Sequence, residues 1–298
     1  MQLVAIQMTS TDDLVANLAV IEARLAEIDF SPKRENGTED GHTLVLLPEN
    51  FALFSSTTDY FKHAERLGDG LVQRQLSQWA KHYQCWLVAG SLPIISDTVG
   101  RVYSTSLAFD PSGQLVQHYN KIHLFDVDID VSAKTDTARL GQRELCKESY
   151  KESDSFIAGD QVATFTAAGI KFGMAICYDL RFPELFRVLS AAQVDILLLP
   201  AAFTYTTGQA HWLPLLQARA IENQCYVLAA NQVGIHPNGR TTWGHSVILD
   251  PWGTILAQQT SQCGIICSRL DKQKLVQIRT DMPILQHARF TARLKYKE

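Results

Sequence analysis

Several features are missing from this chain of 298 residues. Residues 1–8 lack the basic region and the long apolar segment of a secretory signal peptide. No apolar run approaches the ~20 residues needed to span a bilayer, so we expect a cytoplasmic protein with no membrane partner. An excess of one charge is also missing, because 27 Lys and Arg stand against 31 Asp and Glu. Nucleic-acid binding requires a concentrated basic patch, so we predict no nucleic-acid partner.

The cysteines form no C-x-x-C pair and give no sign of a disulfide framework. Cys85 and Cys225 lie in apolar runs, which predicts buried, inert thiols. Cys263 and Cys267 are spaced C-x-x-x-C, but no histidines stand at zinc-site spacing. P-loop, G-x-G-x-x-G, G-x-S-x-G and H-E-x-x-H patterns are missing too, so we predict neither a metal nor a cofactor.

Short apolar runs predict buried strands, with amphipathic helices between them. The predicted strands are 3–8, 43–47, 85–90, 170–176, 195–199 and 225–230. One helix should follow Asp12 and Asp13, where apolar residues recur at steps of three and four up to Ile28. The others are predicted at 71–83, after Cys177 with Pro183 in the first turn, and at 211–223 with Pro214 in the opening turn.

The chain also contains signs of an internal duplication. Two predicted hairpins close on Asp-Pro-x-Gly turns at Asp110 and Asp250, which lie 140 residues apart (250 − 110). The strand at 85–89 recurs at 225–229 with the same offset. Two similar halves favour an α/β protein folded as a four-layer αββα sandwich in one domain, 1–298, although chance resemblance between strands is the alternative. Segments 31–41 and 126–160 are predicted to be loops.

Three residues carry candidate chemistry. Cys177 lies between a predicted strand end and a helix start, where a helix dipole lowers a thiol pKa and backbone N–H groups can stabilise an oxyanion. Glu49 ends a predicted strand and is a candidate general base. Lys121 follows the first hairpin and is a candidate positive charge for an oxyanion. Each also has an ordinary interpretation: a buried structural cysteine, a solvated glutamate and an exposed lysine.

Together these segments resemble the nitrilase superfamily of carbon–nitrogen hydrolases. The matching motifs are Leu-Pro-Glu-Asn-Phe around Glu49, Asn-Lys-Ile-His-Leu-Phe-Asp around Lys121 and Ile-Cys-Tyr-Asp-Leu-Arg-Phe-Pro-Glu-Leu around Cys177. The resemblance extends from residue 2 to about residue 290 and implies the αββα fold and a Glu–Lys–Cys triad. It also implies that Glu49 deprotonates Cys177, that Lys121 holds the oxyanion, and that the reaction passes through a thioester.

The resemblance further implies a second glutamate after the lysine segment. Glu152 fits the family pattern better, and Glu148 remains the alternative. The stretch 128–150 is longer than the family usually shows, and as a lid it would alter the substrate range.

Motifs in the second half resemble the Nit branch, which contains ω-amidases and the amidases that repair deaminated glutathione. These motifs lie at 202–212, 219–223 and 243–246, and the segments 225–227, 239–240 and 285–287 favour the deaminated-glutathione group. The implied partner is a small-molecule amide with an α-keto-acid head. Arg181 is the candidate that binds its carboxylate, and the alternative is that Arg181 is a surface or helix-capping residue. The further candidates for substrate binding are Tyr178, Phe203 and Thr207.

Other functions stay open. Nitrilases and carbamoylases share the implied triad, and a non-catalytic binding relative or a thiol redox protein is an alternative of another class. The superfamily commonly self-associates, so the resemblance implies a homodimer or a larger homo-oligomer.

Overall fold

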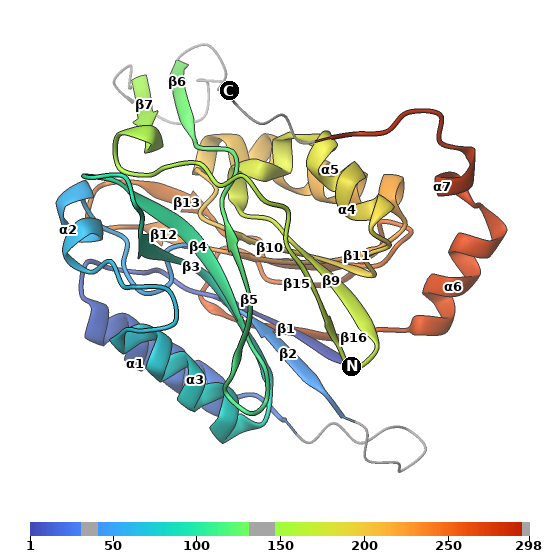
Figure 1. Ribbon diagram of the computed structural model, residues 1–298, viewed down its shortest axis with the longest axis horizontal. Helices are drawn as coiled ribbons and strands as arrows, with labels where there is room; N and C mark the ends of the chain where they lie inside the picture. Colours follow the sequence, from blue (N-terminus) through green and yellow to red (C-terminus); the bar gives the residue numbers. More distant parts are fainter. Residues whose placement is uncertain (31–40, 131–146, 294–298) are drawn as a thin grey trace.

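The computed structural model describes residues 1–30, 41–130 and 147–293. Its main elements form four layers, in which two six-stranded sheets pack face to face with helices outside them (Figure 1). The predicted αββα sandwich is confirmed. Segment 31–40, within the first predicted loop, and residues 131–146, within the 128–150 stretch, lie outside the described residues.

The two sheets have the same internal plan. The first runs β16 (Gly264–Arg269), β1 (Gln2–Gln7), β2 (Thr43–Leu46), β3 (Trp86–Ile95), β4 (Val102–Phe109) and β5 (Leu115–Asn120). The second runs β8 (Thr164–Ala167), β9 (Ile170–Met174), β10 (Ile196–Ala201), β11 (Tyr226–Asn231), β14 (Val247–Leu249) and β15 (Ile255–Gln258). In each, an antiparallel edge strand precedes three parallel strands and then two antiparallel ones. This agrees with the duplication expected from the sequence.

Alternation along the strands divides the apolar side chains between two layers. Leu3 and Ala5 of β1 join the cluster that lies against the second sheet, whereas Val4 and Ile6 join the cluster beneath the helices. The period of two in a strand therefore makes both faces of β1 apolar. This explains why the buried strands read as continuous hydrophobic runs.

Helices cover the outer faces of the sandwich (Figure 1). The helices are α1 (Leu14–Ala26), α2 (Thr57–Lys62), α3 (Leu71–Tyr83), α4 (Pro183–Ala191), α5 (Tyr205–Asn223), α6 (Lys272–Asp281) and α7 (Ile284–His287). α1 and α3 lie on the first sheet, and α4 and α5 lie on the second. Asp13 caps α1 by accepting a hydrogen bond from the N–H of Ala16, and Pro183 opens α4, as predicted.

Helix α5 corrects one prediction. It begins at Tyr205 rather than near residue 211, so Pro214 is ten residues into a helix of 19 and not in its opening turn. A proline there removes one intrahelical hydrogen bond. Burial of Trp212 and Leu216 against the second sheet stabilises the helix across this position.

The segment predicted as a long loop contains a small hairpin. β6 (Asp126–Asp130) pairs antiparallel with β7 (Lys147–Lys151), and a 3-10 turn, η3 (Glu152–Asp154), follows directly. The hairpin projects from the sandwich at the top of Figure 1. A second hairpin, β12 (Val233–Ile235) and β13 (Thr241–Trp243), connects β11 to β14. The prediction of a loop over 126–160 was therefore wrong where β6, β7 and η3 form.

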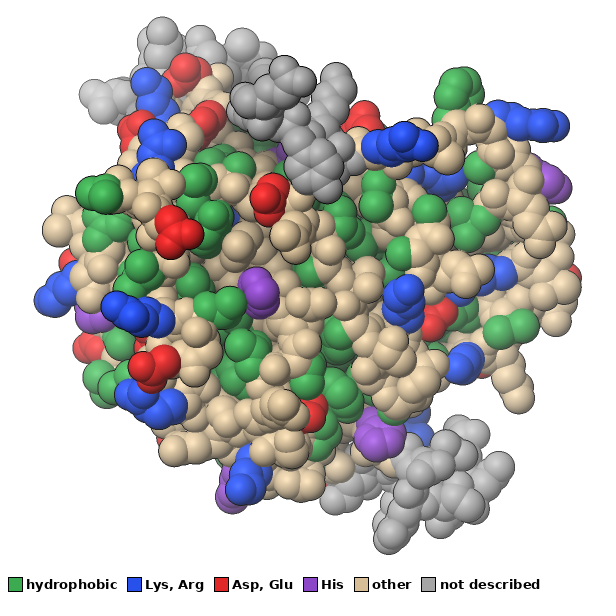
Figure 2. Space-filling view, in the orientation of Figure 1, with side chains coloured by type: hydrophobic (Ala, Val, Ile, Leu, Met, Phe, Trp, Pro, Cys, Tyr) green, Lys and Arg blue, Asp and Glu red, His purple; other side chains and the backbone are tan. Residues whose placement is uncertain are grey.

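The surface carries charges of both signs. Figure 2 shows Lys and Arg side chains interspersed with Asp and Glu on the face that it presents. Within residues 1–30, 41–130 and 147–293, no helix combines the length and the apolar character that crossing a membrane requires.

Candidate active site

Cys177 lies in a tight turn shortly after strand β9. The 3-10 helix η4 (Cys177–Arg181) begins at this residue, whose backbone is left-handed with φ 45°. A positive φ is uncommon for a residue with a side chain and is often retained at functional sites. The N–H groups of a first helical turn generally have no acceptor within the helix; in this turn the N–H of Asp179 donates to the carbonyl of Ile176 at 3.0 Å.

Asp179 fixes this turn from within. One oxygen, Oδ2, accepts hydrogen bonds from the N–H of Ile176 and from the hydroxyl of Tyr119, both at 2.8 Å. The other, Oδ1, lies 3.1 Å from the backbone N and 2.7 Å from Nδ1 of His123. Because Tyr119 and His123 flank Lys121 in the sequence, this carboxylate joins the cysteine turn to the lysine segment. This role of Asp179 was not predicted, although the residue belongs to the motif around Cys177.

Glu49 reaches the same place from the first half of the chain. It follows β2 after a short extended segment, and its side chain is buried. Its Oε2 accepts a hydrogen bond of 2.8 Å from the N–H of Ala202, directly after β10. Gln232 donates to the backbone carbonyl of Glu49 at 2.9 Å. The two halves of the fold therefore hold this carboxylate between them.

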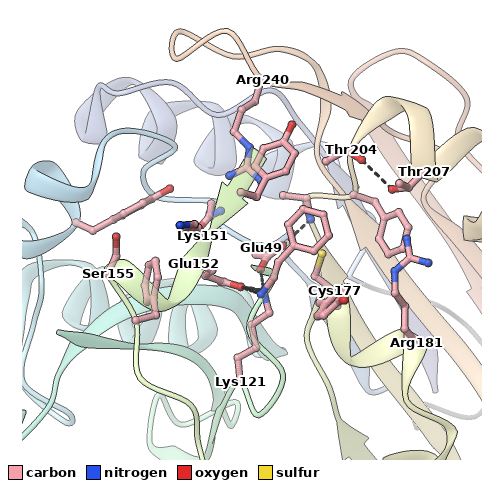
Figure 3. Close-up of a pocket in the computed structure, with 18 of the residues that line it drawn as sticks. Glu49, Lys121, Lys151, Glu152, Ser155, Cys177, Arg181, Thr204, Thr207 and Arg240 are labelled. Atoms are coloured by element: carbon pink, nitrogen blue, oxygen red, sulfur yellow. Dashed lines mark hydrogen bonds and ion pairs between the residues drawn. The ribbon is translucent and has the colours of Figure 1, made fainter. Parts of the chain in front are cut away.

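Lys121 connects two carboxylates. Its Nζ lies 2.9 Å from Oε1 of Glu49 and 2.9 Å from both carboxylate oxygens of Glu152, and its side chain is 2% exposed (Figure 3). Glu152 also accepts a hydrogen bond of 2.6 Å from the N–H of Phe125. The structure thus brings Glu152 to Lys121. Glu148 lies in β7, where its backbone pairs with Ile129.

The charges of this cluster shift its pKa values. Burial raises the pKa of the Cys177 thiol well above its usual value, Glu49 raises it further, and Lys121 opposes both. Burial alone would lower the pKa of Lys121, but Glu152 and Glu49 outweigh it and raise that pKa well above the usual value. Burial also raises the pKa of Glu152, against the opposing effect of Lys121.

The direction at Cys177 corrects the sequence-based expectation of a lowered thiol pKa. Burial is the largest influence on this pKa and the Glu49 carboxylate is the next, and both raise it. At neutral pH the cluster therefore holds a neutral thiol and a charged ammonium.

The cluster lies in a pocket of about 170 Å³ that also contains the four predicted substrate-binding residues, Tyr178, Arg181, Phe203 and Thr207. The Arg181 guanidinium lies 5.1 Å from the ring centroid of Phe203 and 5.8 Å from that of Tyr178. Its Nη1 is 3.1 Å from Nδ1 of His211. Arg181 therefore belongs to the pocket wall rather than to the outer surface.

Comparison with known proteins shows the family to which the chain belongs. The family model described as "Carbon-nitrogen hydrolase" matches residues 3–280. The chain belongs to the carbon–nitrogen hydrolase family. A deaminated glutathione amidase from Yersinia enterocolitica is 39% identical over 291 residues, which cover 97% of this chain and 93% of the relative. Omega-amidase NIT2 from Mus musculus is 36% identical over 251 residues, 84% of each chain.

A solved structure shares the hydrolase fold. Saccharomyces cerevisiae Nit3, a member of branch 10 of the nitrilase superfamily, superposes with a TM-score of 0.78 at 28% identity, covering 97% of both chains. With amidase relatives of this similarity, the chain is a hydrolase of carbon–nitrogen bonds other than peptide bonds.

Several pocket residues of this hydrolase were not predicted. They are Asn50, Ser55, Tyr60, Phe125, Tyr150, Lys151, Ser155, Phe156, Ala202, Thr204 and Arg240. Most come from the β6–β7 hairpin, the turns beside it and the β12–β13 turn, all distant from Cys177 in the sequence. The segment 239–240 was noted beforehand, but as a sign of the family branch and without a place in the site.

Proposed function

We propose that this protein hydrolyses the amide of a small carboxylate substrate through a thioester on Cys177, and that deaminated glutathione is its preferred substrate. The observation that carries the proposal is the buried Glu49–Lys121–Glu152 cluster in one pocket with Cys177. A base, a fixed positive charge and a nucleophile within one pocket are the parts that amide hydrolysis requires.

In the proposed mechanism, Glu49 takes the thiol proton as the Cys177 sulfur attacks the amide carbon. Lys121 and the N–H of Tyr178 stabilise the resulting oxyanion. Protonated Glu49 then passes its proton to the leaving nitrogen, the C–N bond breaks, and the acyl group remains on sulfur as a thioester. Water attacks the thioester while Glu49 accepts one of its protons, and the carboxylic acid leaves as Cys177 regains its proton.

Glu152 has a positioning role in this proposal. It lies on Lys121 rather than on Cys177, and with Glu49 it raises the pKa of the ammonium, which keeps it charged. Arg181 is proposed to bind the α-keto-acid carboxylate, because a guanidinium holds a carboxylate through two parallel hydrogen bonds. Tyr178, Phe203 and Thr207 are proposed as its neighbouring pocket walls.

The substrate preference rests on the 39% identity with the Yersinia amidase. The second candidate, an ω-amidase acting on α-ketoglutaramate, rests on the 36% identity with the mouse relative. Both substrates offer an α-keto-acid head, so the pocket geometry around Arg181 suits either one.

One assay distinguishes these candidates, because hydrolysis of either substrate yields α-ketoglutarate. We expect the wild-type protein to act faster on deaminated glutathione and Cys177→Ala to form no product while remaining folded. Faster turnover of α-ketoglutaramate would overturn the preferred substrate but leave the mechanism. Folded protein that is labelled by iodoacetamide yet hydrolyses neither substrate would favour a binding or redox protein instead.

We also propose that the protein forms a homodimer or larger homo-oligomer as a single hydrolase domain. Large apolar side chains stay exposed on α5 and on the adjoining β14–β15 turn, including Ile221 at 48% and Trp252 at 61%. Gln217 of α5 donates to the carbonyl of Gly253 at 3.0 Å, which places the helix and the turn side by side. Light scattering after gel filtration should show more than one subunit, and Trp252→Glu should reduce the mass; a wild-type monomer would contradict this.

A further inference from the structure

The pocket contains more positive charge than the proposed mechanism uses. Its described lining has four cationic side chains, Lys121, Lys151, Arg181 and Arg240, against two carboxylates, Glu49 and Glu152. Lys121 is paired with both carboxylates, and Arg181 is assigned to the head of the substrate. Two cations, Lys151 and Arg240, are left for which the reaction itself has no task.

Arg240 lies over two aromatic rings, and within the described residues its side chain forms no ion pair. It follows the turn between β12 and β13, and its guanidinium carbon lies 4.4 Å from the ring centroid of Tyr150 and 5.4 Å from that of Phe54. Its Nε is buried and has no hydrogen-bond partner in the described parts of the chain. Contact with aromatic rings uses the faces of a guanidinium and leaves the N–H donors in its plane available.

A buried donor without a partner requires an explanation, because leaving one unsatisfied costs about 1–3 kcal/mol. Here the donor belongs to a residue that lines the pocket. The side chain is therefore poised to donate to an anion within the pocket.

Arg181 and Arg240 lie 59 residues apart in the sequence (240 − 181) and flank the reaction centre. In Figure 3 the two guanidinium groups lie on opposite sides of the Cys177 sulfur. Lys151, at the end of β7, lies on the same side as Arg240. An amide whose carbonyl carbon is at Cys177 would thus extend its acyl part towards Arg181 and its amine part towards Arg240.

We propose that Arg240, assisted by Lys151, binds a second carboxylate, carried on the amine part of the substrate amide. This inference rests on the proposed function and makes it more specific. Deaminated glutathione has such a carboxylate on its terminal glycine, whereas α-ketoglutaramate has an unsubstituted amide nitrogen. Arg240 is then the residue that selects the longer substrate, and the pocket binds amides with a carboxylate at each end.

A matched pair of substrates tests this assignment. One is deaminated glutathione, and the other is its analogue in which the glycine carboxylate is replaced by a carboxamide. We expect the wild-type protein to prefer the carboxylate form in kcat/KM. Arg240→Gln should reduce that preference by about 10- to 100-fold, mainly through KM, because a charge-assisted hydrogen bond is lost. Arg240→Lys, which keeps the charge but not the fork, should retain part of the preference.

The control variant is Arg101→Gln, an exposed arginine outside this pocket, which should leave the preference unchanged. If wild type hydrolyses deaminated glutathione but shows no preference for the carboxylate, the assignment of Arg240 is wrong and the proposed function stands. The same holds if Arg240→Gln slows both substrates equally, since that result indicates a purely structural role. If wild type hydrolyses neither substrate, the proposed function itself fails, and the assignment fails with it.

Discussion

Replacing Lys121 with methionine separates the structural task of this side chain from its chemical one. The ammonium lies 2.9 Å from oxygens of both Glu49 and Glu152, and all three groups are largely buried. Removing one partner from a buried ion pair costs about 3–5 kcal/mol, because the opposite charge remains without compensation. Methionine preserves most of the side-chain volume, so this electrostatic penalty should dominate. We expect Lys121→Met to lower the free energy of unfolding by about 3–5 kcal/mol at pH 8, measured by urea denaturation.

The penalty should depend on pH with a definite sign. Burial already raises the pKa of Glu152 in the presence of Lys121, which opposes that rise. Without Lys121 the pKa should rise further. A carboxyl group with a raised pKa in the folded state contributes most stability below its unfolded pKa of ~4.3, and this contribution is lost as the pH rises through the folded value. The difference in stability between Lys121→Met and wild type should therefore be smaller at pH 5 than at pH 8.

A second substitution completes the test. Lys121→Met combined with Glu152→Gln removes one of the two uncompensated charges and should recover part of the lost stability. Hydrolysis should not recover, because the charge that stabilises the oxyanion is still missing; kcat should stay at least ~100-fold below wild type. A Lys121→Met variant as stable as wild type at pH 8, or a double variant that regains activity along with stability, would contradict these expectations.

Three further outcomes follow from the structure. Alkylation of Cys177 by iodoacetamide, followed by mass spectrometry, should still accelerate with pH above the usual thiol pKa of ~8.5, because the pKa of the Cys177 thiol is raised. A rate that levels off below that pH would contradict the burial argument. Asp179→Asn should destabilise the fold by about 2–4 kcal/mol and reduce kcat, because asparagine has one acceptor oxygen whereas both carboxylate oxygens of Asp179 accept hydrogen bonds. An unchanged melting temperature would contradict this expectation. Gly208→Ala should lower the melting temperature, because the new Cβ would lie 2.3 Å from Cβ of Trp243. This clash should outweigh the better helix propensity of alanine. A higher melting temperature would show that the contact relaxes.

The fold could be predicted largely because its two halves repeat one arrangement. The hairpins at Asp110 and Asp250 formed as expected, and each Asp accepts backbone hydrogen bonds across its own turn. Local patterns of this kind depend on residues that are neighbours in the sequence. The start of α5 was missed for the opposite reason. Thr206, Thr207 and Gly208 are weak helix formers, and their helix is stabilised by packing against elements that the local sequence does not reveal.

Some features of the candidate site could also be predicted from local sequence, whereas others depend on remote contacts. Glu49, Lys121 and Cys177 could be selected because each follows a predicted strand and stands in a motif of the family. The direction of the thiol pKa could not be predicted, since it depends on burial and on Glu49, which is 128 residues away (177 − 49). Arg240 likewise acquires its place through contacts with Phe54 and Tyr150, which belong to remote segments.

The raised thiol pKa fits the proposed chemistry better than a resting thiolate would. With both glutamates ionised, the resting set of Glu49, Lys121, Glu152 and the neutral thiol carries a net charge of −1. In the proposed tetrahedral intermediate, Glu49 holds the proton and the oxyanion carries the negative charge, so the net charge is again −1. The negative charge moves from one oxygen beside Lys121 to another, and the buried pocket does not have to accommodate a change in total charge. A thiolate beside an ionised Glu49 would make the total −2 in a buried cluster, which desolvation disfavours. In this arrangement the lysine stays charged and fixed throughout, as electrostatic stabilisation by a preorganised group requires.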